Sequence, residues 1–353
     1  MTSTVAASEL APRRGWQLSG WQLSGWLLRY CLVAFGVVSL SMGQAAQSQD
    51  VLWLEPATVK GDEKPFSPRS IARRQGIIES LDNKTLVMRP AGEEKSVQVT
   101  ASRVIWIEPG FDDPETIAAV QLFSDRKFAE SIPPLLESVS RGPSVWRAQW
   151  LSMHLWQAAY QAERYPAVLE LVKQIDTRPL PELILGGLPI AWADSRLPAS
   201  AVDAAQAVLA QASVSAATQL VAASWLLGRS GDQAAVAILQ SLAVQKERPS
   251  VAQLAVALLW SKTPPPQLIA RQQAWQRQLE NLPLTLYAGP AALLAHRLEA
   301  AGERERALEL FLAVAITPPR PHEMSTKAHA RAVSLLEQLG RPEEASRLKL
   351  ASP

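Results

Sequence analysis

The feature that most constrains the fold of this 353-residue chain is a helical hairpin that recurs along it. Each unit has an alanine- and leucine-rich helix, a short turn marked by glycine, arginine or an acid, and a second helix. The pattern is found at residues 123–139, 155–175, 220–242, 293–315 and 332–350. One hairpin cannot bury both faces of its helices, so units of this kind must stack on their neighbours.

A small residue early in each second helix gives the period. The alanines aligned in this way are Ala129, Ala167, Ala201, Ala235, Ala307 and Ala345. Their spacings are 38, 34, 34, 72 and 38 residues, and the gap of 72 equals two units, with one more near Ala270. This period predicts a helical-hairpin solenoid of about seven units over residues 114–350. Prolines interrupt residues 178–200 and 262–268, where we expect irregular packing.

These units resemble tetratricopeptide repeats. The small residue that the family has early in the second helix is matched by Ala167 and Ala307, and its turn glycine by Gly302 and Gly340. The chain departs from the family's pattern in two ways: the closing proline is only loosely present, and the large aromatic residue near the start of the first helix is mostly missing. The resemblance implies that the first helices line a concave surface to which a protein or peptide binds.

The sequence before the hairpins predicts a sheet. Residues 74–110 are rich in β-branched side chains and are broken by the turn sequences LDNK and AGEEK, which predicts four short antiparallel strands. A further strand is possible at 51–55, and the proline-containing residues 46–70 otherwise read as a linker. The stretch 50–110 resembles a small Src-homology-3-like barrel, which implies a closed β-barrel domain over 71–110. The expected fold class is therefore mainly α, a tetratricopeptide-like α-hairpin solenoid with a small N-terminal antiparallel β-barrel.

The N-terminus predicts export. Arginines precede the apolar run at residues 31–43, and small residues follow it, as in a signal peptide over 1–45 that is cleaved after Ala45. The alternative is an uncleaved membrane anchor over 26–43. The single cysteine, Cys31, lies in the apolar run, so the mature chain would have no disulfide, thiol nucleophile or thiolate metal site. We expect a location in the periplasm or cell envelope.

Charge and motifs argue against several classes of function. Without the first 45 residues the chain has 32 basic and 32 acidic residues, so it carries no electrostatic signature of a nucleic-acid-binding protein. Its histidines form no metal-binding motif, and it has neither a G-x-S-x-G nucleophile turn nor a glycine-rich phosphate loop after a strand. We therefore predict no catalytic residue, no cofactor and no metal ligand.

A regular series of tryptophans remains as the candidate site. Trp156, Trp192, Trp225 and Trp260 recur at intervals of 36, 33 and 35 residues, and Trp146 and Trp150 lie one helical turn apart. Regular aromatic residues are typical of a ladder that grips a peptide, but packing between repeats predicts the same spacing. The predicted function is a non-enzymatic scaffold that binds another protein or peptide in the envelope. The alternative is an envelope glycan-processing or peptidase-like enzyme whose active site the sequence does not reveal.

Overall fold

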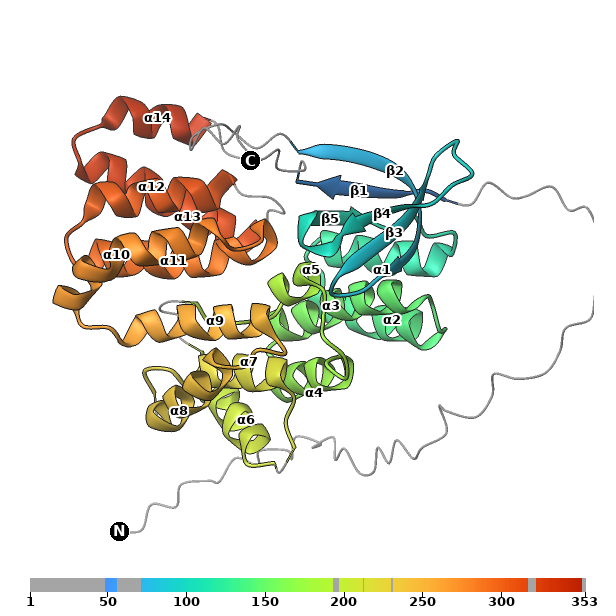
Figure 1. The fold of residues 1–353 in the computed structure, drawn as a ribbon, viewed down its shortest axis with the longest axis horizontal. Helices are drawn as coiled ribbons and strands as arrows, with labels where there is room; N and C mark the ends of the chain where they lie inside the picture. The colour runs from blue at the N-terminus through green and yellow to red at the C-terminus, as the bar shows by residue number, and fades with distance from the viewer. Residues whose placement is uncertain are drawn as a thin grey trace, which may run out of the picture. The chain divides into compact units, whose positions relative to one another are not determined.

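The computed structural model describes residues 48–55, 71–192, 197–211, 213–229, 231–316 and 322–350. All of them belong to one compact unit, residues 46–353. The described part is mainly helical, with fourteen α-helices and one five-stranded antiparallel sheet (Figure 1). The predicted signal peptide or anchor at 1–45 and most of the predicted linker at 46–70 lie outside the described residues. No helix in the described ranges is both long and apolar enough to cross a membrane.

The sheet contains every strand that the sequence predicts, in the order β4-β3-β2-β1-β5. Its strands are β1 (Asp50–Leu54), β2 (Ala72–Leu81), β3 (Thr85–Pro90), β4 (Val97–Thr100) and β5 (Val104–Glu108). The prediction of a closed barrel is wrong, because β4 and β5 are the two edges of the sheet and are joined by a 3₁₀ turn, Ala101–Arg103. A barrel buries its inner face against itself, whereas this sheet shares its apolar core with Trp146 and Leu183 from the helices.

The helices follow one another as pairs joined by short turns. In chain order they are α1 (Pro114–Ser124), α2 (Phe128–Ser140), α3 (Val145–Gln161), α4 (Tyr165–Ile175), α5 (Glu182–Gly186), α6 (Ala199–Leu209), α7 (Ala216–Leu226), α8 (Asp232–Ala243), α9 (Pro249–Leu259), α10 (Pro265–Glu280), α11 (Leu284–Ala300), α12 (Arg304–Ile316), α13 (His322–Gln338) and α14 (Pro342–Leu350). From α1 to α4, α6 to α9 and α10 to α14, each helix packs against the next one in the chain. We call the odd-numbered members first helices.

Four of the turns between paired helices close in the same way. Arg126, Glu163, Gly302 and Gly340 have φ angles of 61°, 58°, 88° and 73°. In each turn the next residue's N–H donates to a carbonyl five residues earlier, as Glu303 does to Leu298 at 2.9 Å. The predicted turn glycines, Gly302 and Gly340, are therefore confirmed, and the two N-terminal turns reach the same geometry without glycine.

The alanine alignment is correct for only part of the array. In α6, α8, α12 and α14 the aligned alanine is buried, as predicted, whereas in α2, α4 and α10 it is exposed. The buried alanines are Ala201, Ala235, Ala307 and Ala345; the exposed ones are Ala129, Ala167 and Ala270. In the second group the buried positions are occupied by neighbouring residues that are larger or polar, such as Val168 and Ser131. The repeat length is therefore kept, but the residue that faces the core is not the aligned alanine.

The helices enclose two apolar clusters. One extends from Ala119 in α1 to Leu258 in α9 and also includes Leu286 of α11, and the other extends from Ala257 in α9 to Ala345 in α14. The half-buried Trp192 packs against both. Trp192 lies in residues 178–200, where the prolines predicted an irregular structure. The region is irregular, because α5 has only five residues and the chain after it is not helical. The interior is thus divided at α9, and an irregular segment touches both parts.

Candidate functional site

The irregular segment at residues 182–192, which we call the inner segment, is the best candidate for a functional site. It consists of α5 followed by a stretch that is neither helix nor strand. In that stretch the N–H of Ile190 donates to the carbonyl of Leu188 at 2.8 Å, and the N–H of Trp192 donates to Ile190 at 3.1 Å. Bonds two residues apart are of the γ-turn kind. The carbonyls of Gly187 and Pro189 and the N–H of Ala191 are bonded to neighbouring side chains instead.

Side chains of two first helices hold these alternate residues by their backbone. Trp156 and Gln157 of α3 donate to the carbonyl of Gly187, from Nε1 at 2.8 Å and from Nε2 at 3.2 Å. Trp225 Nε1 of α7 donates to the carbonyl of Pro189 at 2.8 Å. These bonds are made to the main chain of the inner segment and not to its side chains. Many peptide-binding grooves hold an extended peptide through its main chain in the same way.

The same contact pattern continues at residue 191. Its N–H donates to Ser224 Oγ of α7 at 3.0 Å. Ser224 is itself buried and donates to the carbonyl of Val221 at 2.6 Å, which fixes its hydroxyl as an acceptor for the inner segment. Three alternate positions, 187, 189 and 191, are therefore bonded to side chains of α3 or α7.

A third first helix, α11, approaches the inner segment where glycines leave room. A Cβ added at Gly186 would lie 2.3 Å from the carbonyl oxygen of Thr285, and one added at Gly289 would lie 2.3 Å from the ring of Trp192. Contacts this short exclude any side chain at the two glycines. Glu182 also accepts a hydrogen bond from Ser250 of α9 at 3.1 Å. Helices far apart in sequence thus meet around the inner segment.

The inner segment has a deep part and a shallow part. In the deep part, residues 182–188, the side chains of Leu183, Ile184, Leu185 and Leu188 are buried. Burial of each contributes about 1.5–3 kcal/mol, so together they are comparable with the roughly 5–15 kcal/mol that stabilises a typical domain. The deep part cannot leave without unfolding. The shallow part, residues 189–192, is only half-buried, and each hydrogen bond that holds it has a net worth of about 1 kcal/mol.

The tryptophan series does not form an exposed ladder, and the prediction that its members contact a partner stays a prediction. Trp156 and Trp225 have no exposed surface, and Trp260 is 4% exposed. Trp260 stacks on Trp275, with ring centroids 5.2 Å apart, and belongs to the second helical cluster. Trp192 lies outside every helix, in the shallow part of the inner segment. The burial of Trp156, Trp225 and Trp260 agrees with the alternative interpretation, packing within the core.

Trp146 and Trp150 are buried against the sheet instead. Trp146 Nε1 donates to the carbonyl of Ile78 at 3.1 Å, and Trp150 Nε1 donates to the carbonyl of Ile107 at 3.2 Å. Both indoles are at most 3% exposed, and their contact with a partner likewise stays a prediction. Indole N–H groups must find an acceptor when they are buried, and in these two residues the acceptor is strand backbone.

A buried ion pair ties the same helix to the sheet. The carboxylate of Asp50 accepts hydrogen bonds from the N–H groups of Ile78 and Gly110, each at 2.8 Å, and from Arg147 Nη2 of α3 at 2.9 Å. Asp50 is fully buried, and Arg147 is 19% exposed. A buried carboxylate needs this full set of donors, so the contact fixes the position of β1 on α3.

His154 of α3 is buried in an aromatic cluster beside this junction. Its ring lies 3.7 Å from that of Trp150 and 4.6 Å from that of Phe123, measured between centroids. Burial disfavours the charged imidazolium and lowers the pKa of His154 to about 4, although the hydrogen bond to the carbonyl of Trp150 opposes the shift. A neutral imidazole held in this way is a packing residue at neutral pH, and it makes the junction sensitive to acid.

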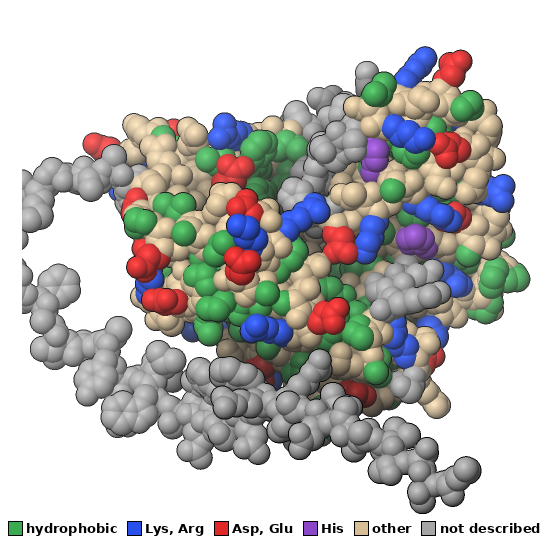
Figure 2. Space-filling view, turned by 180° about the vertical axis from the view of Figure 1, so that it is seen from behind, with side chains coloured by type: hydrophobic (Ala, Val, Ile, Leu, Met, Phe, Trp, Pro, Cys, Tyr) green, Lys and Arg blue, Asp and Glu red, His purple; other side chains and the backbone are tan. Residues whose placement is uncertain are grey.

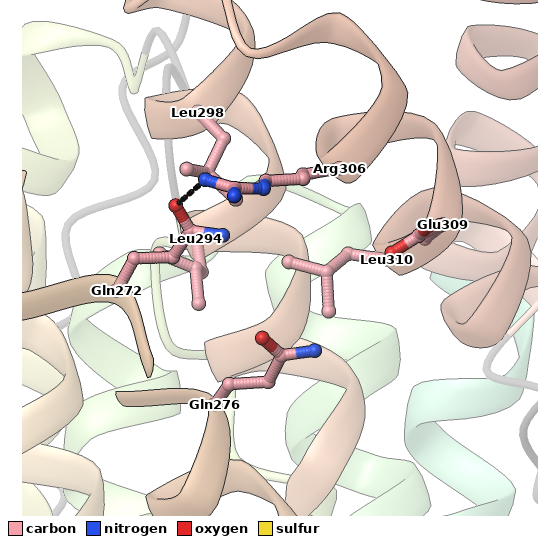
Figure 3. Close-up of a pocket in the computed structure, with 7 residues that line it drawn as sticks. All are labelled: Gln272, Gln276, Leu294, Leu298, Arg306, Glu309 and Leu310. Carbon is pink, nitrogen blue, oxygen red and sulfur yellow. Dashed lines mark hydrogen bonds between the residues drawn. The ribbon is translucent and has the colours of Figure 1, made fainter. Parts of the chain in front are cut away.

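A small hollow lies between α10, α11 and α12 (Figure 3). Its floor is formed by leucines, and its wall by Gln272, whose side-chain oxygen accepts a hydrogen bond from Arg306 at 2.6 Å. With a volume of about 60 Å³ it has room for only a few water molecules. Within the described ranges, no cluster of three or more histidine, cysteine or acidic residues is arranged to hold a metal ion.

Acidic and basic side chains are interspersed on the face of the molecule that Figure 2 shows. This distribution agrees with the balanced charge of the sequence. No known family model matches the chain, and no curated protein matches it. The proposed function therefore rests on the contacts of the inner segment.

Proposed function

We propose that this protein is an exported, non-enzymatic scaffold of the cell envelope whose helices form a tetratricopeptide-like solenoid that binds an extended segment of another protein. One observation carries the proposal. Trp156, Ser224 and Trp225, on first helices, already bind a stretch of chain that is neither helix nor strand by its backbone groups. A surface that holds main chain at alternate residues suits peptides of varied sequence.

The repeated turn geometry supports the solenoid. The turns at Arg126, Glu163, Gly302 and Gly340 share one closing hydrogen-bond pattern, and contacts between units recur at the expected spacing. Arg331 pairs with Glu299, and Arg306 with Gln272, over 32 and 34 residues. Equivalent positions of neighbouring units thus contact each other, as stacked hairpins require.

The location in the envelope rests on the N-terminal sequence, with its apolar run at 31–43 followed by small residues. An anchor formed by residues 26–43 would place the same scaffold on a membrane surface. Either arrangement is compatible with binding through the helices.

The proposal is tested by capture and reconstitution. The tagged full chain is cross-linked in intact cells, the captured proteins are identified, and the leading one is purified and titrated against the chain by calorimetry. A scaffold gives saturable binding to that protein, and Trp225→Phe, which removes the indole donor without burying a charge, weakens it about fivefold. Val244→Ala, at an exposed position just after α8, is the control and leaves binding unchanged.

Failure to find any saturable partner would contradict the scaffold. The enzymatic alternative has its own assay, in which the purified chain is incubated with peptidoglycan fragments and envelope peptides. Turnover that disappears when one carboxylate is replaced would make an enzyme the better conclusion.

A further inference from the structure

We propose that the shallow part of the inner segment, residues 189–192, is a built-in competitor that occupies the partner's binding groove and must be displaced when the partner binds. This inference rests on the scaffold function proposed above and specifies its site. The site consists of Ser224 and Trp225 on α7, with Gly289 of α11 at the far end. The ligand class is an extended apolar peptide that carries a bulky aromatic side chain.

The hydrogen bonds define what the groove recognises. Trp225 Nε1 donates to the carbonyl of Pro189, and the hydroxyl of Ser224 accepts from the N–H of Ala191. A carbonyl and the N–H two residues later lie on the same side of an extended chain. Both bonds use main-chain groups of the segment, so a partner's main chain satisfies the same donor and acceptor.

The aromatic requirement comes from Trp192. Its ring lies over Gly289 so closely that a methyl group there would be 2.3 Å away, and it packs against both helical clusters. A side chain of this size fits because α11 has a glycine at the contact. The partner that replaces residues 189–192 must fill the same space, which selects a large flat ring over an aliphatic side chain.

The division into deep and shallow parts makes displacement feasible. The side chain of Leu188 is 6% exposed and stays anchored in the first helical cluster, whereas residues 189–192 are half-buried. The shallow part can therefore leave while its neighbour remains in place. The deep part keeps α3, α9 and α11 together throughout, so exchange needs no unfolding.

The first experiment measures peptide binding by fluorescence anisotropy, using the full chain and a labelled synthetic peptide with the sequence of residues 186–192, GGLPIAW. Trp192→Ala removes the aromatic anchor of the competitor and leaves the groove residues intact. We expect this variant to bind the peptide at least tenfold more tightly than the unaltered chain. Ser224→Ala in the Trp192→Ala background should reverse most of the gain.

Two controls accompany it. The peptide GGLPIAA lacks the aromatic residue and should bind at least tenfold more weakly to the Trp192→Ala variant. Trp53→Ala removes another half-buried indole, on the sheet, and should leave peptide binding as in the unaltered chain. Equal binding by the unaltered chain and a folded Trp192→Ala variant would overturn the inference.

A second measurement needs no substitution and covers the case in which Trp192→Ala does not fold. Hydrogen exchange of the amides of Ala191 and Trp192 is followed in the unaltered chain with and without saturating peptide. Displacement predicts exchange at least tenfold faster than that of Leu185 in the deep part, and a further acceleration when the peptide is added. Exchange at the rate of Leu185, unchanged by peptide, would overturn the inference. If that result is obtained and the unaltered chain still captures a partner, the scaffold function holds but displacement of residues 189–192 does not.

Discussion

Two junctions of the molecule use the same contact, a hydrogen bond from a buried indole to a backbone carbonyl. One joins α3 to the sheet, and the other joins α7 to the shallow part of the inner segment. In the first, Trp150 donates to the carbonyl of Ile107 at 3.2 Å, and in the second, Trp225 donates to the carbonyl of Pro189 at 2.8 Å. The strand that contains Ile107 is also paired with β1, in which Leu52 lies opposite Ile107. In the described residues around Pro189 there is no such ladder, so side chains of α3 and α7 carry most of the binding.

The difference shows that a buried indole donor does not by itself reveal what it holds in place. Where the bound backbone is already hydrogen-bonded in a sheet, the tryptophan only adds to a permanent contact. Where the bound backbone has few other bonds, the tryptophan forms part of a groove whose occupant can change. The predictions below test this contrast, beginning with the largest effect.

The sheet junction should fail when its buried carboxylate is removed. Asp50→Ala leaves Arg147 and the N–H groups of Ile78 and Gly110 without their acceptor, so we expect a loss of about 3–5 kcal/mol in the free energy of unfolding. Urea denaturation measures it. Glu94→Ala, at an exposed position in the β3–β4 turn, is the control and should leave the midpoint unchanged. A loss below about 1 kcal/mol would mean that the junction does not depend on this ion pair.

Acid should weaken the sheet junction before it affects the groove. The pKa of His154 is about 4 in the folded chain and 6.5 in an exposed histidine, so the unfolded state binds the proton first. The stabilisation is complete above pH 6.5, declines as the pH falls, and has lost about 3 kcal/mol near pH 4. Denaturation measured from pH 7 to 4 checks this, and His154→Leu should flatten the profile. An unchanged slope in that variant would assign the acid sensitivity to other groups.

A matched pair of substitutions gives the smallest effect and the sharpest comparison. Trp150→Phe and Trp225→Phe each remove one buried indole hydrogen bond to a backbone carbonyl, at a cost of about 1–2 kcal/mol. We expect similar losses of stability from both. Only Trp225→Phe should accelerate hydrogen exchange at Ala191, while Trp150→Phe should leave it unchanged. If both variants accelerate that amide equally, the two junctions are not distinct and the contrast fails.

The sequence predicted the local elements well because local physics decides them. The strands at β2 to β5 follow from alternating β-branched residues between turns, and Gly302 and Gly340 adopt the positive φ expected at the end of a helix. The alanine register was right at Ala235 and Ala307 and wrong at Ala167, because several residues in a helix are small enough to align and only packing shows which one faces the core.

The sequence indicated only part of the candidate site. The spacing of Trp156 and Trp225 drew attention to the correct helices, but the sequence could not say that the bound chain is their own. No motif or spacing in the sequence distinguished residues such as Gln157, Ser224 and Gly289 from others of the same type. The glycines and proline at 186–189 marked an irregular region, and this was the one sign of the inner segment that a reading of the sequence could use.

By itself, the sequence determined that the chain forms helical hairpins preceded by strands, since periodicity and turn residues act over a few positions and fix local conformation. Tertiary structure decided that the sheet stays open, that the apolar interior is divided at α9, and that Trp192 packs over Gly289 of α11 and against both helical clusters. Those outcomes depend on contacts between residues tens to more than a hundred positions apart. Their free energies arise only when the surfaces meet, so no local pattern records them.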